Sequence, residues 1–188
     1  PDTEPCDIWL IDEDGLHEER LAVDPPAAIS DLAWSPEGTR LALSSPASDG
    51  GLWVTTIASG AMHKLVDGVV GNLSWSADGL QLAFGFGLFS AVWMVDADGT
   101  NRSLLFDRAR DPAFSPDGIR MAMTLQGTDS APIGIMDITD PQRDYLPPTD
   151  QLAVPSLGSS WAPTGQQLVY QAGWQDEASL WIINADGS

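Results

Sequence analysis

A stretch of ten residues recurs four times along the 188-residue chain, and it constrains the fold more than any other feature. Each copy has an aromatic residue, a short polar segment that ends in Gly, and a run of alternating apolar residues. The copies align without a gap and cover 34–43, 75–84, 114–123 and 161–170. Because chance similarity seldom persists over four such segments, we interpret the pattern as an internal structural repeat.

Each copy of this pattern predicts a β-hairpin. In the first and third copies the aromatic residue is followed by Ser-Pro-Glu-Gly (35–38) or Ser-Pro-Asp-Gly (115–118). Proline presets φ at the first turn position, and Gly can take the left-handed conformation that a turn closing into a bulge requires. The alternating residues after Gly, such as 40–43, then predict the returning strand.

A second pattern begins the chain and follows every hairpin. It is a short apolar strand, with Trp at its second position in most copies, before a turn rich in Asp and Gly. These strands are expected at 8–11, 52–54, 92–95, 133–136 and 180–183, and weaker outer strands are expected at 19–23, 62–66, 102–106 and 143–146. If the hairpin strands are A and B, the apolar strand C and the outer strand D, the predicted order is C-D, then A-B-C-D three times, then A-B-C.

The spacing of the repeats predicts the fold class. The aromatic residues that start the copies are 41, 39 and 47 residues apart. A period of about 40–45 residues with four short strands per unit is typical of a β-propeller blade. We therefore predict an all-β chain that forms one β-propeller domain (1–188) of four-stranded antiparallel blades.

The expected propeller has about four and a half repeat units. The units are 7–24 (strands C and D only), 30–67, 71–107, 111–147 and 156–187 (strands A, B and C only). A propeller is built from complete four-stranded sheets, so the first and last units would each leave strand edges unpaired. We therefore expect either a fragment of a larger propeller or a ring completed by self-association.

The tryptophans follow the same repeat. Seven of the eight lie on predicted A or C strands: Trp9, Trp34, Trp53, Trp75, Trp93, Trp161 and Trp181. We expect these rings to pack between neighbouring blades rather than to stack on a ligand. The eighth, Trp174, lies between the B and C strands of the last unit and is a candidate ligand-stacking residue.

The charge and the hydrophobic pattern restrict the partners. The net charge is −19, with 27 acidic and 8 basic residues, so nucleic acid and anionic membrane surfaces are disfavoured. The most apolar stretch, 80–95, is interrupted by polar residues and Gly and is shorter than the roughly 20 residues that a membrane helix needs. No membrane insertion is expected, and the single cysteine, Cys6, cannot form an internal disulfide.

Three polar residues share one position, three residues before the aromatic residue of their repeat: Asp31, Asn72 and Asp111, with Gly158 in the last copy. Strand A lines the central channel of a propeller, so these side chains could meet near one mouth of the channel and bind a cation or a polar ligand. The alternative is that each side chain caps its own turn through an Asx hydrogen bond.

The face of the propeller that carries this mouth is the expected binding face. It is formed by the D–A connections together with the B–C loops, which vary between repeats while the A–B and C–D turns do not. The B–C loops are 44–51, 85–90, 126–131 and 172–178. Variable loops on a rigid scaffold commonly carry recognition.

Enzyme and metal motifs are missing from the sequence. It contains no Gly-x-Ser-x-Gly, no His-Glu-x-x-His, no phosphate-binding loop and no dinucleotide fingerprint. His17 and His63 follow C–D turns and are expected at the outer edge. The Asp-x-Asp-Gly turns at 12–15 and 96–99 lack the further ligands of a calcium loop. We therefore expect no enzyme, no catalytic residue, no metal site and no cofactor.

The Trp-Ser-Pro-Asp-Gly type of hairpin, together with the Ile-Trp-Leu-Ile-Asp-x-Asp-Gly segment (8–15), resembles the repeat of the TolB-like β-propellers, which are related to the WD-type repeat. The resemblance covers essentially the whole chain. It implies a non-enzymatic scaffold that binds a protein or peptide, in the bacterial periplasm or outside the cell.

Similar repeats also form the propeller domains of prolyl-oligopeptidase-like serine peptidases. The alternative function is therefore that of a propeller domain that controls substrate access to such a peptidase. A further alternative is a carbohydrate-binding propeller in which Trp174 stacks on a sugar.

Overall fold

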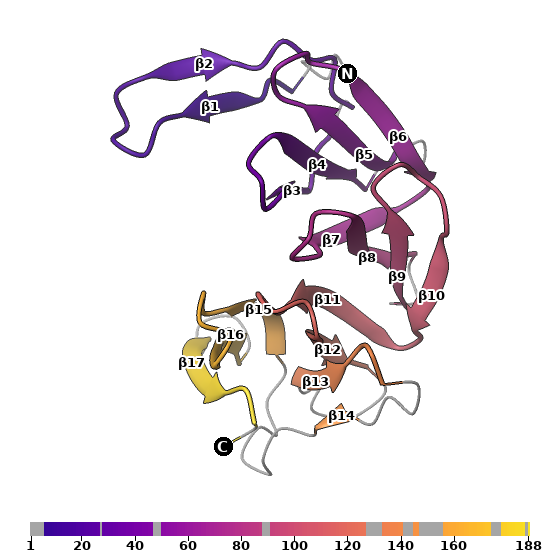
Figure 1. Cartoon of the computed structure of the whole chain (residues 1–188), viewed down its shortest axis with the longest axis vertical. Helices are drawn as coiled ribbons and strands as arrows, with labels where there is room; N and C mark the ends of the chain where they lie inside the picture. The colour runs from indigo at the N-terminus through magenta and orange to yellow at the C-terminus, as the bar shows by residue number, and fades with distance from the viewer. Residues whose placement is uncertain are drawn as a thin grey trace.

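The structure is a computed structural model that describes residues 6–26, 28–46, 50–87, 91–126, 133–140, 145–146, 156–173, 178–186 and 188. In this part of the chain every helix or strand assigned is a β-strand, and no helix is long and apolar enough to cross a membrane. The strands form five antiparallel sheets that follow one another around an open arc (Figure 1).

The first sheet has two strands, β1 (Trp9–Ile11) and β2 (Glu18–Arg20). Blade 1 contains β3 (Asp31–Trp34), β4 (Arg40–Ser45), β5 (Gly51–Thr56) and β6 (Met62–Asp67). Blade 2 contains β7 (Val70–Trp75), β8 (Gln81–Phe86), β9 (Ala91–Asp96) and β10 (Ser103–Phe106). Blade 3 contains β11 (Ala109–Phe114), β12 (Arg120–Leu125), β13 (Ile133–Asp137) and β14 (Tyr145–Leu146). The last sheet contains β15 (Ser156–Trp161), β16 (Gln167–Ala172) and β17 (Ser179–Asn184).

This arrangement confirms the predicted all-β propeller fold. Each blade is a four-stranded meander in which strands neighbouring in sequence are also hydrogen-bonded neighbours. The A strands (β3, β7, β11 and β15) lie on the inner side of the arc, and the D strands (β6, β10 and β14) lie on its outer side (Figure 1).

The repeated hairpins owe their geometry to the residues of the turn. In blade 1 the Gly38 N–H donates to the Ser35 carbonyl (2.9 Å) and Gly38 has a φ of +69°. The Ser35 hydroxyl accepts the N–H of Arg40 (3.0 Å), which fixes the start of the returning strand. The same bonds recur in blades 2 and 3, where Ser76 and Ser115 replace Ser35. The turn serines are buried and their hydroxyls are engaged locally.

The hydrophobic core lies between consecutive sheets. One face of blade 1 packs against the opposite face of blade 2, with Ala42, Leu52 and Val54 on one side and Leu82 and Phe84 on the other. Equivalent clusters join the first sheet to blade 1, blade 2 to blade 3, and blade 3 to the last sheet. Because fully burying each large apolar side chain is worth roughly 1.5–3 kcal/mol, the junctions between sheets dominate the stability of the fold.

The tryptophan prediction is right at the inner junctions and wrong near the ends. Trp75 is only 7% exposed and packs against blade 1 as predicted. In contrast, Trp9, Trp34 and Trp181 are 57%, 51% and 49% exposed. Among the described residues, no sheet precedes that of Trp9, the first sheet has no A strand beside Trp34, and the sheet of Trp181 has no D strand. The described residues therefore do not cover these three rings.

Candidate functional site

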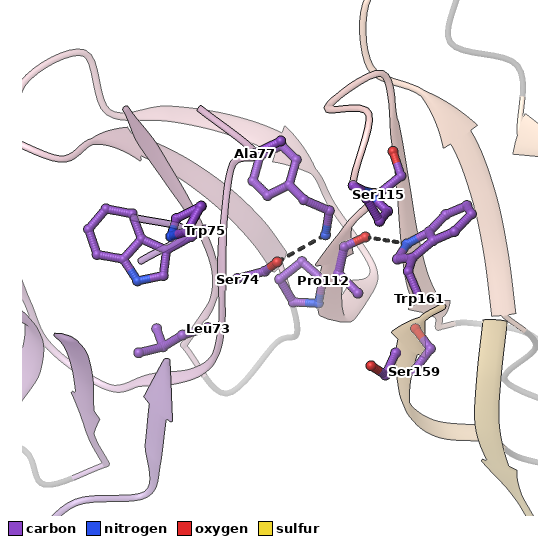
Figure 2. Close-up of a pocket in the computed structure, with 13 residues that line it drawn as sticks. Leu73, Ser74, Trp75, Ala77, Pro112, Ser115, Ser159 and Trp161 are labelled. Atoms are coloured by element: carbon purple, nitrogen blue, oxygen red, sulfur yellow. Dashed lines mark hydrogen bonds between the residues drawn. The ribbon is translucent and has the colours of Figure 1, made fainter. Parts of the chain in front are cut away.

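A cavity lies along the inner side of the arc, over the A strands of blades 2 and 3 and of the last sheet (Figure 1). Its volume is about 480 Å³. We call it the inner groove and define it by Ser74, Trp75, Pro112, Phe114, Ser159 and Trp161. Trp75 and Trp161 stand on opposite sides of this groove, with Ser74 and Pro112 between them (Figure 2).

Hydrogen bonds between neighbouring A strands fix the inner groove. The Trp161 Nε1–H donates to the carbonyl of Ala113 in blade 3 (3.0 Å). The backbone N–H of Phe114 donates to the Ser74 hydroxyl of blade 2 (2.9 Å); both bonds are drawn in Figure 2. Because the A strands belong to different sheets, these bonds set the distance between strands that no sheet hydrogen bond joins.

Two arginines strengthen the junctions that contain a tryptophan. Arg40, the first residue of β4, donates to the Gly79 carbonyl in the turn of blade 2 (2.7 Å), and its guanidinium lies 4.7 Å from the Trp75 ring centre. Arg120 makes the same contacts with Gly165 (2.8 Å) and Trp161 (4.9 Å). A guanidinium over an indole face is attracted by the ring quadrupole.

Turn carboxylates orient these arginines. Glu37 accepts a hydrogen bond from Arg40 Nε (2.6 Å), and this bond lowers the pKa of Glu37 to about 2. Asp117 lies 3.3 Å from Arg120, and hydrogen bonds from Ser115 and then from the Ile119 N–H lower the pKa of Asp117. Both carboxylates are ionised at neutral pH and hold the arginines toward the next blade.

The structure brings the predicted residues Asp31, Asn72 and Asp111, together with Gly158, into the wall of one smaller cavity. We call it the upper cavity; its volume is about 170 Å³. It shares Leu73, Pro112 and Ser159 with the inner groove. The two cavities therefore adjoin each other at these A-strand residues.

The two carboxylates of the upper cavity bridge neighbouring blades. Asp31 Oδ2 accepts the N–H of Leu73 in blade 2 (2.6 Å), besides a bond from its own neighbour Leu32. Asp111 Oδ2 accepts bonds from the Thr124 hydroxyl (3.1 Å) and from the N–H of Gly158 in the last sheet (3.4 Å). Asp111 is buried and lies 3.6 Å from Arg110 Nε. The bonds from Leu73 and Gly158 come from the next A strand, which the hypothesis of simple turn capping does not anticipate.

Asn72 occupies the same register but has a different environment. The residue equivalent to the hydrogen-bonded Leu73 is Pro112, which has no N–H to donate. No hydrogen bond of the Asn72 side chain is found within the described residues, and the residue is exposed. Its amide can therefore donate to and accept from a ligand in the upper cavity.

The backbone explains why Asn, Asp and Gly stand at this register. Asn72, Asp111 and Gly158 have φ values of 47°, 55° and 55°. Each lies at a β-bulge of its A strand, where the pairing register shifts. Asn, Asp and Gly are the residues that best tolerate this left-handed conformation. The residue types alone contained this signal, which the sequence analysis did not use.

The two histidines do not line either cavity. Trp174 lies outside the described residues, as do the central parts of the B–C loops. His17 Nδ1 lies 3.1 Å from Asp12, and with Asp14 they form an exposed polar cluster at the β1–β2 turn. His63 is exposed on β6. Within the described part of the chain, neither histidine is hydrogen-bonded to a serine or cysteine side chain.

No family model matches the chain. A solved structure of a protein assigned as TolB from Agrobacterium tumefaciens is 16% identical, with a TM-score of 0.83 over 97% of this chain and 71% of that one. The nidogen/laminin complex contains a similar chain (15% identity, TM-score 0.70, 87% of this chain, 64% of that one). The β-propeller domain of Cps50 (Swd1) from Myceliophteria thermophila is also similar (21% identity, TM-score 0.64, 84% and 52%).

These likenesses show the fold: the chain has a TolB-like β-propeller repeat fold. It spans less than two thirds of the length of the second and third of these chains.

Proposed function

We propose that this chain is a non-enzymatic β-propeller scaffold that binds a protein or peptide segment along its inner surface. The observation that carries the proposal is that the inner groove and the upper cavity adjoin, sharing Leu73, Pro112 and Ser159 as lining residues. An extended segment can follow such a surface from the mouth at Asp31, Asn72 and Asp111 to the A–B turns.

The chemistry of the surface suits a peptide with apolar and basic side chains. Aromatic rings and prolines line the inner groove, and such groups provide large, rigid contact areas. Ser159 lines both cavities, and its hydroxyl has no hydrogen-bond partner among the described residues, so it is a candidate to bond to a peptide group.

The mouth of the surface suits a basic group. The carboxylates of Asp31 and Asp111 and the amide of Asn72 line the upper cavity, and the whole chain carries a net charge of −19. A lysine or arginine of the partner would meet complementary charge there, and the acidic surface would speed its approach.

The cellular location of the protein and its two alternative functions are also proposals. The TolB-like fold supports a place in the bacterial cell envelope or outside the cell. The peptidase alternative depends on an accompanying hydrolase domain with a Gly-x-Ser-x-Gly motif, and the carbohydrate alternative depends on Trp174. Both stay predictions.

Selection from a random peptide library displayed on phage tests the proposal. Ser160 lines the inner groove and is exposed, so Ser160→Trp should fill the groove without disturbing the core. We expect the wild-type chain to enrich peptides that contain Lys or Arg beside apolar residues. Ser160→Trp should abolish their binding, while the matched Ser160→Ala variant should retain it.

The result that would contradict the proposal is equally direct. Enriched peptides that bind Ser160→Trp as well as the wild-type chain would place recognition elsewhere on the molecule, and an absence of any enrichment would leave the inner surface without a binding role.

A further inference from the structure

The upper cavity collects one polar residue from each of the four A strands. Asp31 lies on β3, Asn72 on β7, Asp111 on β11 and Ser159 on β15. All four residues line the same volume of about 170 Å³. Oxygen acceptors that come from separate strands and surround so small a volume suit a compact cation.

Two of these four residues have a side chain without a hydrogen-bond partner in the described part of the chain. The Ser159 Oγ is shielded from solvent and yet makes no hydrogen bond. A shielded polar atom of this kind is normally satisfied by a ligand or a water molecule. The Asn72 side chain makes none either, and the residue is exposed. Ser159 and Asn72 therefore mark the part of the cavity that can bond to a ligand.

The two carboxylates of the cavity offer single oxygen acceptors rather than two free oxygens side by side. Both oxygens of Asp31 already accept backbone N–H groups. Asp111 Oδ2 accepts the Thr124 hydroxyl and the N–H of Gly158, whereas no hydrogen bond to its Oδ1 is found among the described residues. A planar guanidinium matches two free oxygens of one carboxylate, while an ammonium group directs three donors to separate acceptors. This lining therefore suits an ammonium group better.

The charge around the cavity favours a monovalent cation. Asp31 and Asp111 contribute two carboxylates, and Arg110 Nε lies 3.6 Å from Asp111 Oδ2. Within the described residues no basic side chain forms an ion pair with Asp31. One negative charge is thus left without a partner. A single ammonium group balances it, whereas a divalent metal ion would leave an excess of positive charge beside Arg110.

We propose that the upper cavity binds a primary ammonium group of the partner peptide, in preference to a guanidinium group or a divalent metal ion. The ammonium group donates to Asp111 Oδ1, Asn72 Oδ1 and Ser159 Oγ, and the carboxylate of Asp31 adds negative charge. This inference rests on the proposed function for the nature of the partner. It narrows the basic group of that partner to the amine of a lysine or of the peptide N-terminus.

Small cations test the cavity without any peptide. Chloride salts of n-butylammonium, n-butylguanidinium and calcium are titrated at constant ionic strength into the isotope-labelled chain, and the NMR signals of the Leu73 and Gly158 N–H groups and of the Asn72 side-chain amide are followed. We expect n-butylammonium to shift these signals with a dissociation constant on the order of millimolar. n-Butylguanidinium should bind roughly threefold or more weakly, and calcium more weakly still.

Variants of the chain locate the bound cation. Asp111→Asn removes one charge but keeps an oxygen for the N–H of Gly158, and it should weaken n-butylammonium binding roughly tenfold. Asn72→Gly retains the positive φ and removes the amide, and roughly threefold weaker binding is expected. The matched control is Asp98→Asn, which changes the net charge equally but lies in an exposed turn outside the cavity; it should leave binding unchanged. Circular dichroism verifies that each variant folds.

The source of the amine is identified with peptides that bind the chain. Acetylation of the peptide N-terminus and replacement of its lysines by norleucine each remove one kind of amine, and we expect one of the two changes to weaken binding roughly tenfold. Peptides that tolerate both changes would contradict the assignment of the upper cavity to an ammonium group.

The results with small cations can overturn the proposal independently. Equal binding of n-butylammonium and n-butylguanidinium would do so, as would tighter binding of calcium or unchanged affinity in both Asp111→Asn and Asn72→Gly. Because n-butylammonium requires no peptide, it can bind the upper cavity even where no peptide binds the inner groove, so failure of this proposal is distinguishable from failure of the proposed function.

Discussion

Blades 1 and 2 meet differently from blades 2 and 3, although the backbone repeat is the same. At the first junction the Trp75 indole donates to Ala33, and Arg40 covers the ring. At the second junction Phe114 replaces the tryptophan, and its backbone N–H donates to Ser74.

The arginine changes along with the tryptophan. Gln81 stands where Arg40 stands in blade 1, and its amide bonds to Asp96 within its own blade (2.8 Å). The junction between blade 3 and the last sheet returns to the first solution, with Trp161 and Arg120. The comparison teaches that each junction uses a matched set of residues, and that either set holds the neighbouring A strands together.

The largest expected effect is the difference in stability lost when a buried and an exposed tryptophan are replaced. Trp75→Ala should lower the free energy of unfolding by ~3–5 kcal/mol, because it removes a buried ring and a hydrogen bond. Trp34→Ala, at the equivalent position but 51% exposed, should cost less than about 1 kcal/mol. Urea denaturation measures both, and equal costs would refute the assigned difference in burial.

The junction between blades 2 and 3 depends on the Ser74 hydroxyl. Ser74→Ala leaves the N–H of Phe114 without its acceptor and should cost ~1–2 kcal/mol of unfolding free energy. The matched control is Ser159→Ala, at an A-strand position whose hydroxyl has no hydrogen-bond partner in the described part of the chain, and it should be nearly neutral. If both substitutions cost the same in urea denaturation, the Ser74 bond does not hold this junction.

The arginine contact at the first junction should be worth less. Arg40→Gln installs the residue of blade 2 and removes both the bond to Gly79 and the contact with Trp75. We expect a loss of ~1 kcal/mol in the free energy of unfolding. Arg20→Gln, which breaks an exposed pair with Asp7, should change it by much less. A larger loss of unfolding free energy for Arg20→Gln than for Arg40→Gln would show that the contact of Arg40 with the next blade contributes nothing.

The smallest effect concerns pH. The folded-state pKa of Glu37 is lowered from its ordinary value of 4.5 to about 2 by Arg40. The corresponding stabilisation is fully present above pH 4.5 and is lost as the pH falls toward 2. Because the Glu37 side chain is 39% exposed, solvent screening reduces this contribution to less than about 1 kcal/mol. Glu37→Gln should remove this part of the pH dependence of unfolding, and an unchanged profile would contradict it.

The local pattern of the sequence was sufficient to predict the strand order and the turns. Gly at the end of each hairpin motif does adopt a left-handed φ, as at Gly38 and Gly118, because the turn type depends only on neighbouring residues. The convergence of Asp31, Asn72 and Asp111 followed from their common register. Their roles as ligand-binding residues stay a prediction.

Contacts between blades could not be predicted from the same pattern. The bond from Leu73 to Asp31 joins residues that are 42 positions apart and in different sheets. The exposure of Trp34 and Trp181 depends on which strands their own and neighbouring sheets contain, not on the residues next to them in the sequence. A repeat pattern gives the internal structure of one blade, whereas burial requires the arrangement of all of them.

Exchange of the tryptophan indole protons, followed by NMR in deuterated buffer, tests most directly whether the A strands are joined as described. The indole protons of Trp75 and Trp161 should exchange slowly because each is bonded to a carbonyl of the preceding blade, and that of Trp34 should exchange within the dead time. Equally fast exchange at Trp34, Trp75 and Trp161 would mean that the junctions, and with them the inner groove, do not form.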